Sequence, residues 1–292
     1  MRFDVVCAGA VYLDLTFDGL DGLPSPGEER WARELQVSPG GMANTAIGLA
    51  RLGMRTAVAW PLGRDATGAY LRATLEAEGV SCAGPSAERS SITAVMPFDG
   101  DRAMVSFEPP DGGRAEVIAE LAPRAVVALV DQIHLCPPGA LAYATTSHAH
   151  ARTVEPGAVP AVHALIANEQ EALGLSGATD ARSAACWLAE RAETAVVTLG
   201  ADGALAASGR CVEQVPAPTG EVRDVTGAGD LFAAAYVWAD LRGLGLRERL
   251  TWATLYATLS LSKVTAFAGA VRLSQLYEAG RQLGLSPPAC QP

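Results

Sequence analysis

The chain has 292 residues, 49% of them apolar, and a formal net charge of -10 at pH 7, so we expect one large α/β domain or two smaller ones, able to bury roughly three quarters of the unfolded surface. The negative net charge argues against a general binder of nucleic acid or anionic membranes, because binding to those partners depends on clustered Lys and Arg. Lys263 is the only lysine, which excludes a P-loop, and no complete Gly-x-Gly-x-x-Gly follows the first apolar run, so a dinucleotide-binding fold has little support.

Short apolar runs and helical periodicities alternate along the chain. Taken in order, strands are expected at residues 3–9, 55–61, 125–130, 161–166 and 195–199, and helices at 43–52, 67–78, 138–149 and 179–192. This alternation is typical of a mostly parallel sheet with helices on both faces. The apolar stretch 251–271 contains Thr, Ser and a lysine, which is typical of a buried helix. We therefore expect no transmembrane segment.

Two segments interrupt this alternation. Residues 91–96 and 103–107 are joined by a turn that contains Asp99-Gly100, a hairpin signal. The stretch 29–37 interleaves apolar and polar residues and carries Trp31. These pieces are expected to form a small sheet that stands off the main domain; an ordinary hairpin on a compact domain is the alternative.

Polar and glycine residues near the N-terminus mark a candidate ligand site. Gly40 and Gly41 precede an apolar helix, and Asn44 lies in its first turn, where an amide either caps the helix or hydrogen-bonds a polyhydroxylated ligand. Asp14 follows the first expected strand, where it either makes a turn or accepts hydrogen bonds from hydroxyl groups. Because ligands of open parallel sheets bind beyond the carboxyl ends of the strands, we expect these four residues to converge.

A second candidate site lies in the C-terminal half. The segment from Asp224 to Asp230 reads Asp-Val-Thr-Gly-Ala-Gly-Asp and leads into an apolar helix. Gly227 and Gly229 let the backbone approach an anion closely, and the first amides of a helix have no intrahelical partner. The helix dipole favours the ionised form of Asp230 by roughly 0.3 to 2 kcal/mol, so this carboxylate could accept a hydroxyl proton. A plain helix start is the alternative.

The two glycine segments, in this order, resemble the two signatures of the ribokinase-like (PfkB) carbohydrate kinases. Weaker marks of the family lie between them, so that the resemblance covers nearly the whole chain: Gly63-Arg64-Asp65 with Gly68, Asn168-Glu169-Gln170-Glu171, and Thr198-Leu199-Gly200-Ala201-Asp202-Gly203. The resemblance implies a single domain over residues 1–292, built as a three-layer α/β/α sandwich with a mostly parallel central sheet. It also implies a β-sheet lid, from inserts around 12–17, 29–38 and 91–107, that pairs with a second subunit in a homodimer.

By the same resemblance, the chain is expected to be an ATP-dependent kinase that phosphorylates a primary hydroxyl of a ribose, fructose, ketodeoxy sugar acid or ribonucleoside. Asp230 is then the general base, and the amides of Gly227, Ala228 and Gly229 stabilise the transferred phosphoryl group. Sugar contacts are assigned to Asp14, Gly40, Gly41 and Asn44. Nucleotide contacts are assigned to Asn168, Thr198, Gly200, Gly203 and Thr226.

The resemblance also implies metal sites. Asn168 and Glu171 are expected to hold Mg²⁺ through water. Asp224 is expected to anchor its loop or to bind a monovalent cation such as K⁺, together with residues 266–270. Adenine is placed on apolar surface near Val215, Leu255 and Tyr256.

Three positions depart from the family pattern. Val225 stands where a Thr is usual, Glu155 lies in a segment where many relatives carry Asp-Pro-Asn, and Tyr256 lies about where many have an Asn near the nucleotide. The departures at Val225 and Glu155 are the support for one alternative, a catalytically silent sugar or nucleotide sensor. A kinase for a sugar phosphate is another, and it should show an arginine cluster at the acceptor pocket.

The remaining candidate ligands are weak. The six cysteines form no Cys-x-x-Cys, and no signal peptide is evident, so we expect reduced thiols in a cytoplasmic protein. His148 and His150 have ligand-like spacing but lack further ligands nearby, which favours a solvated helix end.

Overall fold

The computed structural model describes residues 3–98, 101–110, 112–147 and 159–288. Its centre is a nine-stranded sheet of order β15-β14-β13-β12-β11-β10-β1-β4-β6. The strands are β1 (Val5–Ala8), β4 (Thr56–Val58), β6 (Ser81–Cys82), β10 (Ala125–Leu129), β11 (Leu141–Thr145), β12 (Val162–Asn168), β13 (Ala192–Thr198), β14 (Ala204–Ser208) and β15 (Cys211–Val215). All neighbours are parallel except β13–β14 and β14–β15.

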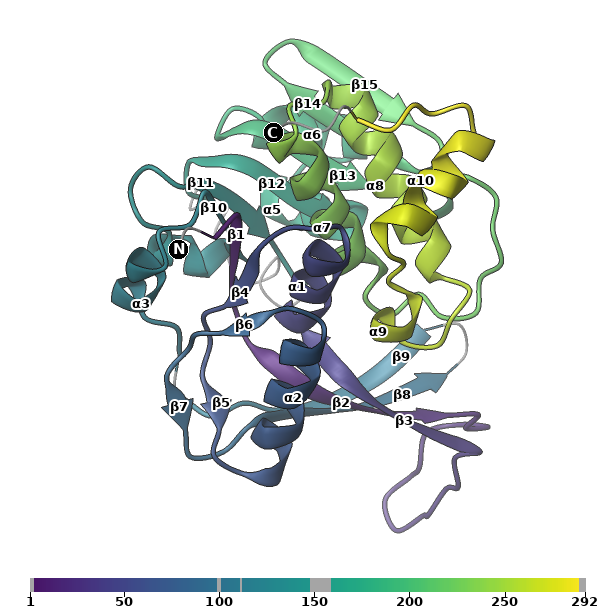
Figure 1. Ribbon diagram of the computed structural model, residues 1–292. Coiled ribbons are helices and arrows are strands. Elements are labelled where there is room, and N and C mark those ends of the chain that lie inside the picture. The colour runs from purple at the N-terminus through teal and green to yellow at the C-terminus, as the bar shows by residue number, and fades with distance from the viewer. Residues whose placement is uncertain (1–2, 99–100, 111, 148–158, 289–292) are drawn as a thin grey trace.

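Helices cover both faces of this sheet (Figure 1). In front lie α1 (Met42–Arg51), α7 (Ala228–Leu241), α8 (Leu246–Ser260) and α10 (Leu273–Gln282), and behind lie α5 (Glu169–Ser176) and α6 (Ala181–Leu188). The remaining elements are α2 (Ala66–Ala77), α3 (Ala115–Glu120), α9 (Ala266–Gly269), the 3₁₀ turns η1 (Val130–Leu135) and η2 (Gly200–Asp202), and a β5 (Leu62–Gly63) to β7 (Ser86–Ala87) pair. Every residue of β1 is fully buried, which is why its sequence is continuously apolar.

The helix expected at 138–149 is wrong. Residues Leu141–Thr145 form β11, which pairs in parallel with β10 on one side and β12 on the other. Alanine favours helices in isolation, but here Ala144 is a fully buried sheet residue, so tertiary pairing overrides local propensity. Residues 148 and 149 lie outside the described part.

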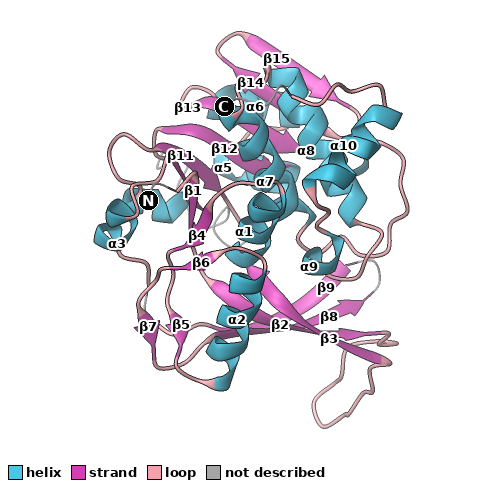
Figure 2. Ribbon diagram, viewed as in Figure 1, coloured by secondary structure: helices cyan, strands magenta, loops and turns pink. Residues whose placement is uncertain are grey.

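A separate four-stranded sheet stands below the main domain (Figure 2), in the order β3-β2-β8-β9. Its strands are β2 (Val11–Asp18), β3 (Glu34–Gly41), β8 (Ser91–Phe98) and β9 (Asp101–Phe107). The expected small sheet is thus present. Strand β3 begins later than expected, so Trp31 lies in the β2–β3 loop with 80% of its surface exposed.

The two faces of this small sheet differ in chemistry, because successive side chains of a strand point to opposite faces. One cross-strand row is polar and reads Ser38, Asp14, Thr93 and Ser106. The opposite face is apolar and carries Leu35, Val37, Leu13, Leu15, Phe17, Ile92, Ala94, Met96, Ala103, Val105 and Phe107. One face of this sheet is therefore suited to a hydrophilic ligand and the other to burial.

A buried charge network fixes the C-terminal end of α7 to the sheet. The Asp240 carboxylate accepts hydrogen bonds from the Tyr143 hydroxyl (2.5 Å) and His163 Nε2 (2.7 Å), and it pairs with Arg249 Nη1 at 2.5 Å. Burial opposes ionisation of Asp240, but these hydrogen bonds and the charge of Arg249 outweigh it and lower its pKa. The hydrogen bond to Asp240 raises the pKa of His163. The network therefore holds α7 in one register against β11 and β12.

No helix among the described residues is both long enough and apolar enough to span a bilayer. The helix expected within 251–271 is present only in part: α8 ends at Ser260 and packs on α7, β14 and β15, and α9 follows after a turn.

The charge network predicts a pH-dependent stability. Because the pKa of His163 is raised on folding, its stabilising contribution is full below its unfolded pKa of about 6.5 and is lost as the pH rises through the folded value. His163→Gln should therefore lower the free energy of unfolding more at pH 6 than at pH 9, as measured by urea denaturation. His134→Gln, on an exposed turn, is the control and should show no such difference. An equal loss at both pH values for His163→Gln would contradict this interpretation.

Candidate functional site

The N-terminal ends of α1 and α7 meet at one hydrogen bond. Asn44 Nδ2 donates to Asp230 Oδ2 at 3.0 Å, across 186 residues of sequence, and Thr45 Oγ1 donates to the backbone carbonyl of Asp230 at 3.3 Å. No side chain caps α1, so the capping alternative for Asn44 is wrong. Asn44 is only 5% exposed, and its Oδ1 has no partner in the described protein. This oxygen is therefore a buried acceptor that lacks a donor.

Glycine shapes the start of α7. Gly227 is its N-cap with φ of 72°, and a Cβ there would lie 2.4 Å from Ala266 Cβ and 3.0 Å from Asn44 Nδ2, so no other residue fits. The amide of Ala228 donates to the Val225 carbonyl at 3.2 Å, so one of the three amides expected to bind phosphate is already engaged. Within the described chain, the amides of Gly227 and Gly229 donate to no protein acceptor.

Gly229 faces open space. A Cβ added there would meet no heavy atom within 4 Å, in contrast to the crowding at Gly227. Two free amides and an open volume at a helix N-terminus make an anion site.

The Asp230 carboxylate is tuned by its surroundings. Burial raises its pKa to about 6, while the Asn44 hydrogen bond and the charge of Arg102 act in the opposite direction. The helix dipole alone would favour ionisation, so burial outweighs the effect expected from the sequence. The carboxylate still predominates at pH 7, as expected.

Asp14 lies on the polar face of the small sheet, within β2, and not directly after the first strand as expected. Burial raises its pKa to about 7, the charge of Asp230 acts in the same direction, and Arg102 opposes both. A Cβ on Gly40 would lie 1.9 Å from Asp14 Oδ2, so only glycine leaves room for this carboxylate. Gly41 is the N-cap of α1 with φ of 60°. The structure thus brings together the residues predicted to contact the acceptor.

Arg102, on β9, is a site residue that the sequence analysis missed. The register of the β8–β9 pairing places it on the same face of the small sheet as Asp14. Its charge lowers the pKa values of both Asp14 and Asp230, which shows that it lies within electrostatic reach of them. The alternation of side chains along the hairpin was the available signal.

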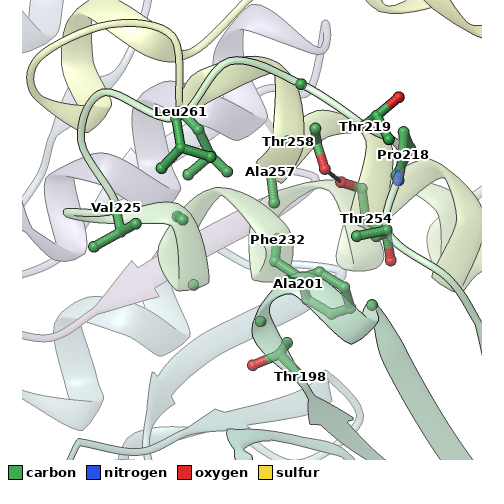
Figure 3. A pocket seen from close by; sticks show the side chains of 17 residues that line it. Thr198, Ala201, Pro218, Thr219, Val225, Phe232, Thr254, Ala257, Thr258 and Leu261 are labelled. Carbon is green, nitrogen blue, oxygen red and sulfur yellow. Dashed lines mark hydrogen bonds between the residues drawn. The ribbon is translucent and has the colours of Figure 1, made fainter. Parts of the chain in front are cut away.

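A cavity of about 510 Å³ opens beside the anion site (Figure 3). It is lined by Thr198, Gly200, Ala201, Gly203, Ala217, Pro218, Thr219, Gly220, Val222, Val225, Ala228, Gly229, Phe232, Thr254, Ala257, Thr258 and Leu261. Three of the predicted nucleotide contacts, Thr198, Gly200 and Gly203, are among them. Thr226 is not; its amide donates instead to Asp224 Oδ1. The volume is in the range of small-molecule sites.

The surface predicted to hold adenine is not part of this cavity. Val215, Leu255 and Tyr256 are all buried and none of them lines the cavity. On α8 the cavity is lined by Thr254, Ala257 and Thr258, at the i, i+3 and i+4 spacing of one helix face. Tyr256 points elsewhere, and its hydroxyl donates to the Val271 carbonyl at 3.0 Å.

Asn168 and Glu171 form a reciprocal cap at the start of α5. Glu171 N donates to Asn168 Oδ1 at 2.9 Å, and Asn168 N donates to Glu171 Oε2 at 3.0 Å. Burial raises the pKa of Glu171, although its hydrogen bond from the Asn168 backbone opposes this, and Asp230 is close enough to raise it further. The prediction of a capped helix start is therefore confirmed. The cap uses only Oε2 of Glu171, so Oε1 takes no part in it.

These oxygen donors fit Mg²⁺ only through water. Among the described residues, no group of three or more His, Cys, Asp or Glu side chains could hold a metal directly. Mg²⁺ usually keeps several waters and takes other ligands from substrate phosphates. The carboxylate of Glu171 and the amide of Asn168 therefore fit an ion that is held through its waters.

Asp224 anchors the loop that leads into α7, which is the first of the two roles expected for it. Its Oδ1 accepts from Thr226 N and its Oδ2 from Thr265 N, both at 2.8 Å. The K⁺ alternative fits less well. Arg51 Nη1 donates to the carbonyls of Phe267 (2.7 Å) and Ala270 (2.6 Å), so a guanidinium already occupies two of the carbonyls in 266–270.

Two earlier features, Glu155 and the pair His148 and His150, lie outside the described residues.

Comparisons with known proteins agree with this geometry. The family model described as pfkB family carbohydrate kinase matches residues 2–137 and 138–270. A ribokinase of Lactococcus lactis subsp. lactis is 30% identical over 91 residues, which are 31% of this chain and only 30% of that protein.

Solved structures share the fold. The ribokinase of Thermotoga maritima superposes with a TM-score of 0.81 at 19% identity, covering 96% of this chain and 99% of that one. The Arabidopsis thaliana ribokinase complexed with ribose and ATP superposes with a TM-score of 0.76 at 21% identity, covering 96% and 99%. The expected sandwich with a mostly parallel sheet and a small separate sheet is confirmed.

The raised pKa of Asp230 predicts that Asp230→Asn stabilises the protein at alkaline pH. The carboxyl ionises near pH 6 when folded but near 3.8 when unfolded, so the wild type loses stability as the pH rises through 6. At pH 8 the variant should gain about 3 kcal/mol in free energy of unfolding, since one pKa unit corresponds to roughly 1.4 kcal/mol and the pKa rises by about two units on folding. Urea denaturation should show the gain shrinking toward pH 4, while the exposed Asp202→Asn control stays unchanged. A destabilised Asp230→Asn variant at pH 8 would contradict the assignment.

Proposed function

Because this chain belongs to the pfkB family of carbohydrate kinases, we propose that it transfers the γ-phosphoryl group of ATP to a primary hydroxyl of a sugar or sugar-like acceptor. The observation that carries this proposal is the carboxylate of Asp230, which is held by Asn44 beside two free helix amides and next to a nucleotide-sized cavity. The following arguments assign roles to these groups.

Asp230 is the proposed general base. Its pKa of about 6 lies close enough to neutral pH for the carboxylate to be ionised and still able to take a proton from an attacking hydroxyl. The hydrogen bond from Asn44 fixes one carboxylate oxygen, so the other is left to face the acceptor. Such a base contributes roughly 10² to 10⁴ in rate.

The amides of Gly227 and Gly229 are the proposed phosphoryl site. The transition state is loose and spreads negative charge over the phosphoryl oxygens, so fixed donors at a helix N-terminus stabilise it. The nucleotide lies in the cavity that Gly229 borders, with Thr198, Gly200 and Gly203 along its wall. Asn168 and Glu171 would hold Mg²⁺ through water, and the ion would neutralise charge on the phosphates. We place the reaction in the cytoplasm, where ATP is supplied.

The polar face of the small sheet is the proposed acceptor contact. The Asp14 carboxylate and the unpartnered Asn44 Oδ1 are acceptors, as sugar hydroxyl groups require, and Gly40 gives Asp14 the room to reach them. A sheet that contacts the acceptor on one face can close as a lid and keep water from the phosphate.

A neutral acceptor is favoured over a sugar phosphate. The charges that act on the Asp14 carboxyl are those of Asp230 and of one arginine, Arg102, and not those of an arginine cluster. Two carboxylates facing one guanidinium would repel a doubly charged phosphate. The Arabidopsis ribokinase, complexed with ribose and ATP, is consistent with a pentose as the first acceptor to test.

The silent-sensor alternative has little structural support. Of the two departures that motivated it, Glu155 lies outside the described residues. Val225 borders the cavity with 49% of its surface exposed and leaves the Gly227 and Gly229 amides open.

The apolar face of the small sheet is the proposed dimer interface. It carries exposed residues on both edge strands, with Leu35 53%, Val37 44%, Val105 67% and Phe107 43% exposed. A continuous apolar face of a four-stranded sheet is costly to leave in water, and a second copy of the same face would cover it isologously.

The kinase proposal predicts ATP-dependent phosphorylation of at least one member of a panel of pentoses, hexoses, sugar acids and ribonucleosides. Asp230→Asn should lower kcat by 10² to 10⁴ while leaving ADP affinity unchanged, because the variant removes only proton acceptance. The kcat of the wild type should fall as the pH drops below about 6. A variant that retains full activity, or a wild type that binds ADP and an acceptor without turnover, would overturn the proposal.

The interface proposal predicts that Val105→Glu dissociates a dimer. Sedimentation should shift from dimer to monomer, because burying an unpaired charge in an apolar interface is strongly disfavoured. Met104→Glu is the matched control: it is a neighbouring exposed residue on the opposite face of β9 and should leave the dimer intact. A wild type that sediments as a monomer at all concentrations excludes this interface.

A further inference from the structure

Among the described residues, the end of the cavity away from the start of α7 lacks charged and amide side chains, which are common means of distinguishing one nucleobase from another. Figure 3 shows Val225 at one side of the cavity and Pro218, Thr219 and Thr254 at the other. None of the lining side chains in the described chain is charged or carries an amide. The side-chain hydrogen-bonding groups are four threonine hydroxyls, on Thr198, Thr219, Thr254 and Thr258.

Thr254 is the unusual member of this set. It is only 5% exposed, and its hydroxyl has no hydrogen-bond partner among the described residues. Three other hydroxyl side chains of α8 donate to carbonyls of their own helix: Thr251 to Arg247 (2.8 Å), Thr258 to Thr254 (2.9 Å) and Ser260 to Ala257 (2.7 Å). A buried hydroxyl that is not satisfied by its helix needs another partner, because leaving it unpaired costs free energy.

We propose that the Thr254 hydroxyl contacts the purine edge of the phosphoryl donor and that the site accepts guanine as well as adenine. The proposal rests on the proposed function, since it concerns the donor of the same reaction. A hydroxyl rotates and both donates and accepts, so it can accept from the adenine amino group or donate to the guanine oxo group. The rest of the base lies against Phe232 and Ala257, which bury either purine equally well.

Discrimination between purines would need a fixed donor or acceptor that one base leaves unpaired. Sites built on such groups reject the wrong ligand by large factors, whereas apolar pockets discriminate weakly. With a rotatable hydroxyl as the buried side-chain contact, neither purine leaves a polar group of Thr254 unsatisfied. The expected preference between ATP and GTP is therefore small.

The test is the binding of ADP and GDP, each with Mg²⁺, to the full chain by isothermal calorimetry. The two dissociation constants should agree within about 10-fold, and Thr254→Val should weaken both by about 3- to 10-fold, the size of one hydrogen bond. Thr254→Ser, which keeps the hydroxyl, should bind like the wild type. Thr251→Val is the matched control, because it removes a hydroxyl of the same helix outside the cavity.

Three outcomes would overturn the inference: ADP bound more than 100-fold tighter than GDP, Thr254→Val without effect on either nucleotide, or Thr254→Val weakening ADP alone. Binding is measured without turnover, so these outcomes are independent of the kinase proposal. A chain that binds both nucleotides as expected but phosphorylates no acceptor contradicts the proposed function and leaves the base contact standing.

Discussion

The site depends on two helix N-termini from opposite ends of the chain being held at one point. The hydrogen bond from Asn44 to Asp230 marks this point, and close packing of α1 on α7 makes it achievable. The helices approach closely at Gly48, since a Cβ there would lie 2.9 Å from Ala234 Cβ and 3.0 Å from a Leu231 methyl group. A larger residue at Gly48 would push the helices apart and separate the amide from the carboxylate. At the other end of α7, Asp240 fixes the helix to the sheet, so neither end is free to slide.

The buried carboxyl groups at this point cost stability when they are ionised, as is common at functional sites. Asp14, Asp230 and Glu171 are all desolvated, and in each case the largest effect of the surroundings is a rise in pKa. The charge of Asp230 raises the pKa values of the other two, whereas Arg102 offsets part of this for Asp14 and Asp230 only. Perturbed carboxyl groups gathered at an anion site fit a reaction that moves a proton and a phosphoryl group together. The same arrangement explains why the small sheet matters, because its polar face supplies both Asp14 and Arg102.

Local motifs could be predicted from the sequence, but the relative positions of residues that lie far apart in the sequence could not. The glycines around Asp230 and the cap at Asn168 are encoded within a few residues, so their conformations followed from the order of residue types. Asp14 was misplaced because Gly9 and Ala10 separate two strands that the apolar run does not distinguish.

The errors at β11 and α8 have the same origin. Leu141–Thr145 reads as a helix until β10 and β12 are known to flank it. Tyr256 was placed near the nucleotide by resemblance to the family. Because several sides of α8 are buried, the sequence does not show that the face of Thr254 and Thr258 borders the cavity. Arg102 needed the register of a hairpin before its face could be known.

The most direct test of this account is a crystal structure with Mg²⁺, a non-hydrolysable ATP analogue and an accepted sugar. The account predicts the γ-phosphate against the amides of Gly227 and Gly229, with one sugar hydroxyl within about 3 Å of the Asp230 carboxylate, as general base catalysis requires. A sugar bound with no hydroxyl near Asp230, or phosphates seated away from both glycines, would contradict it.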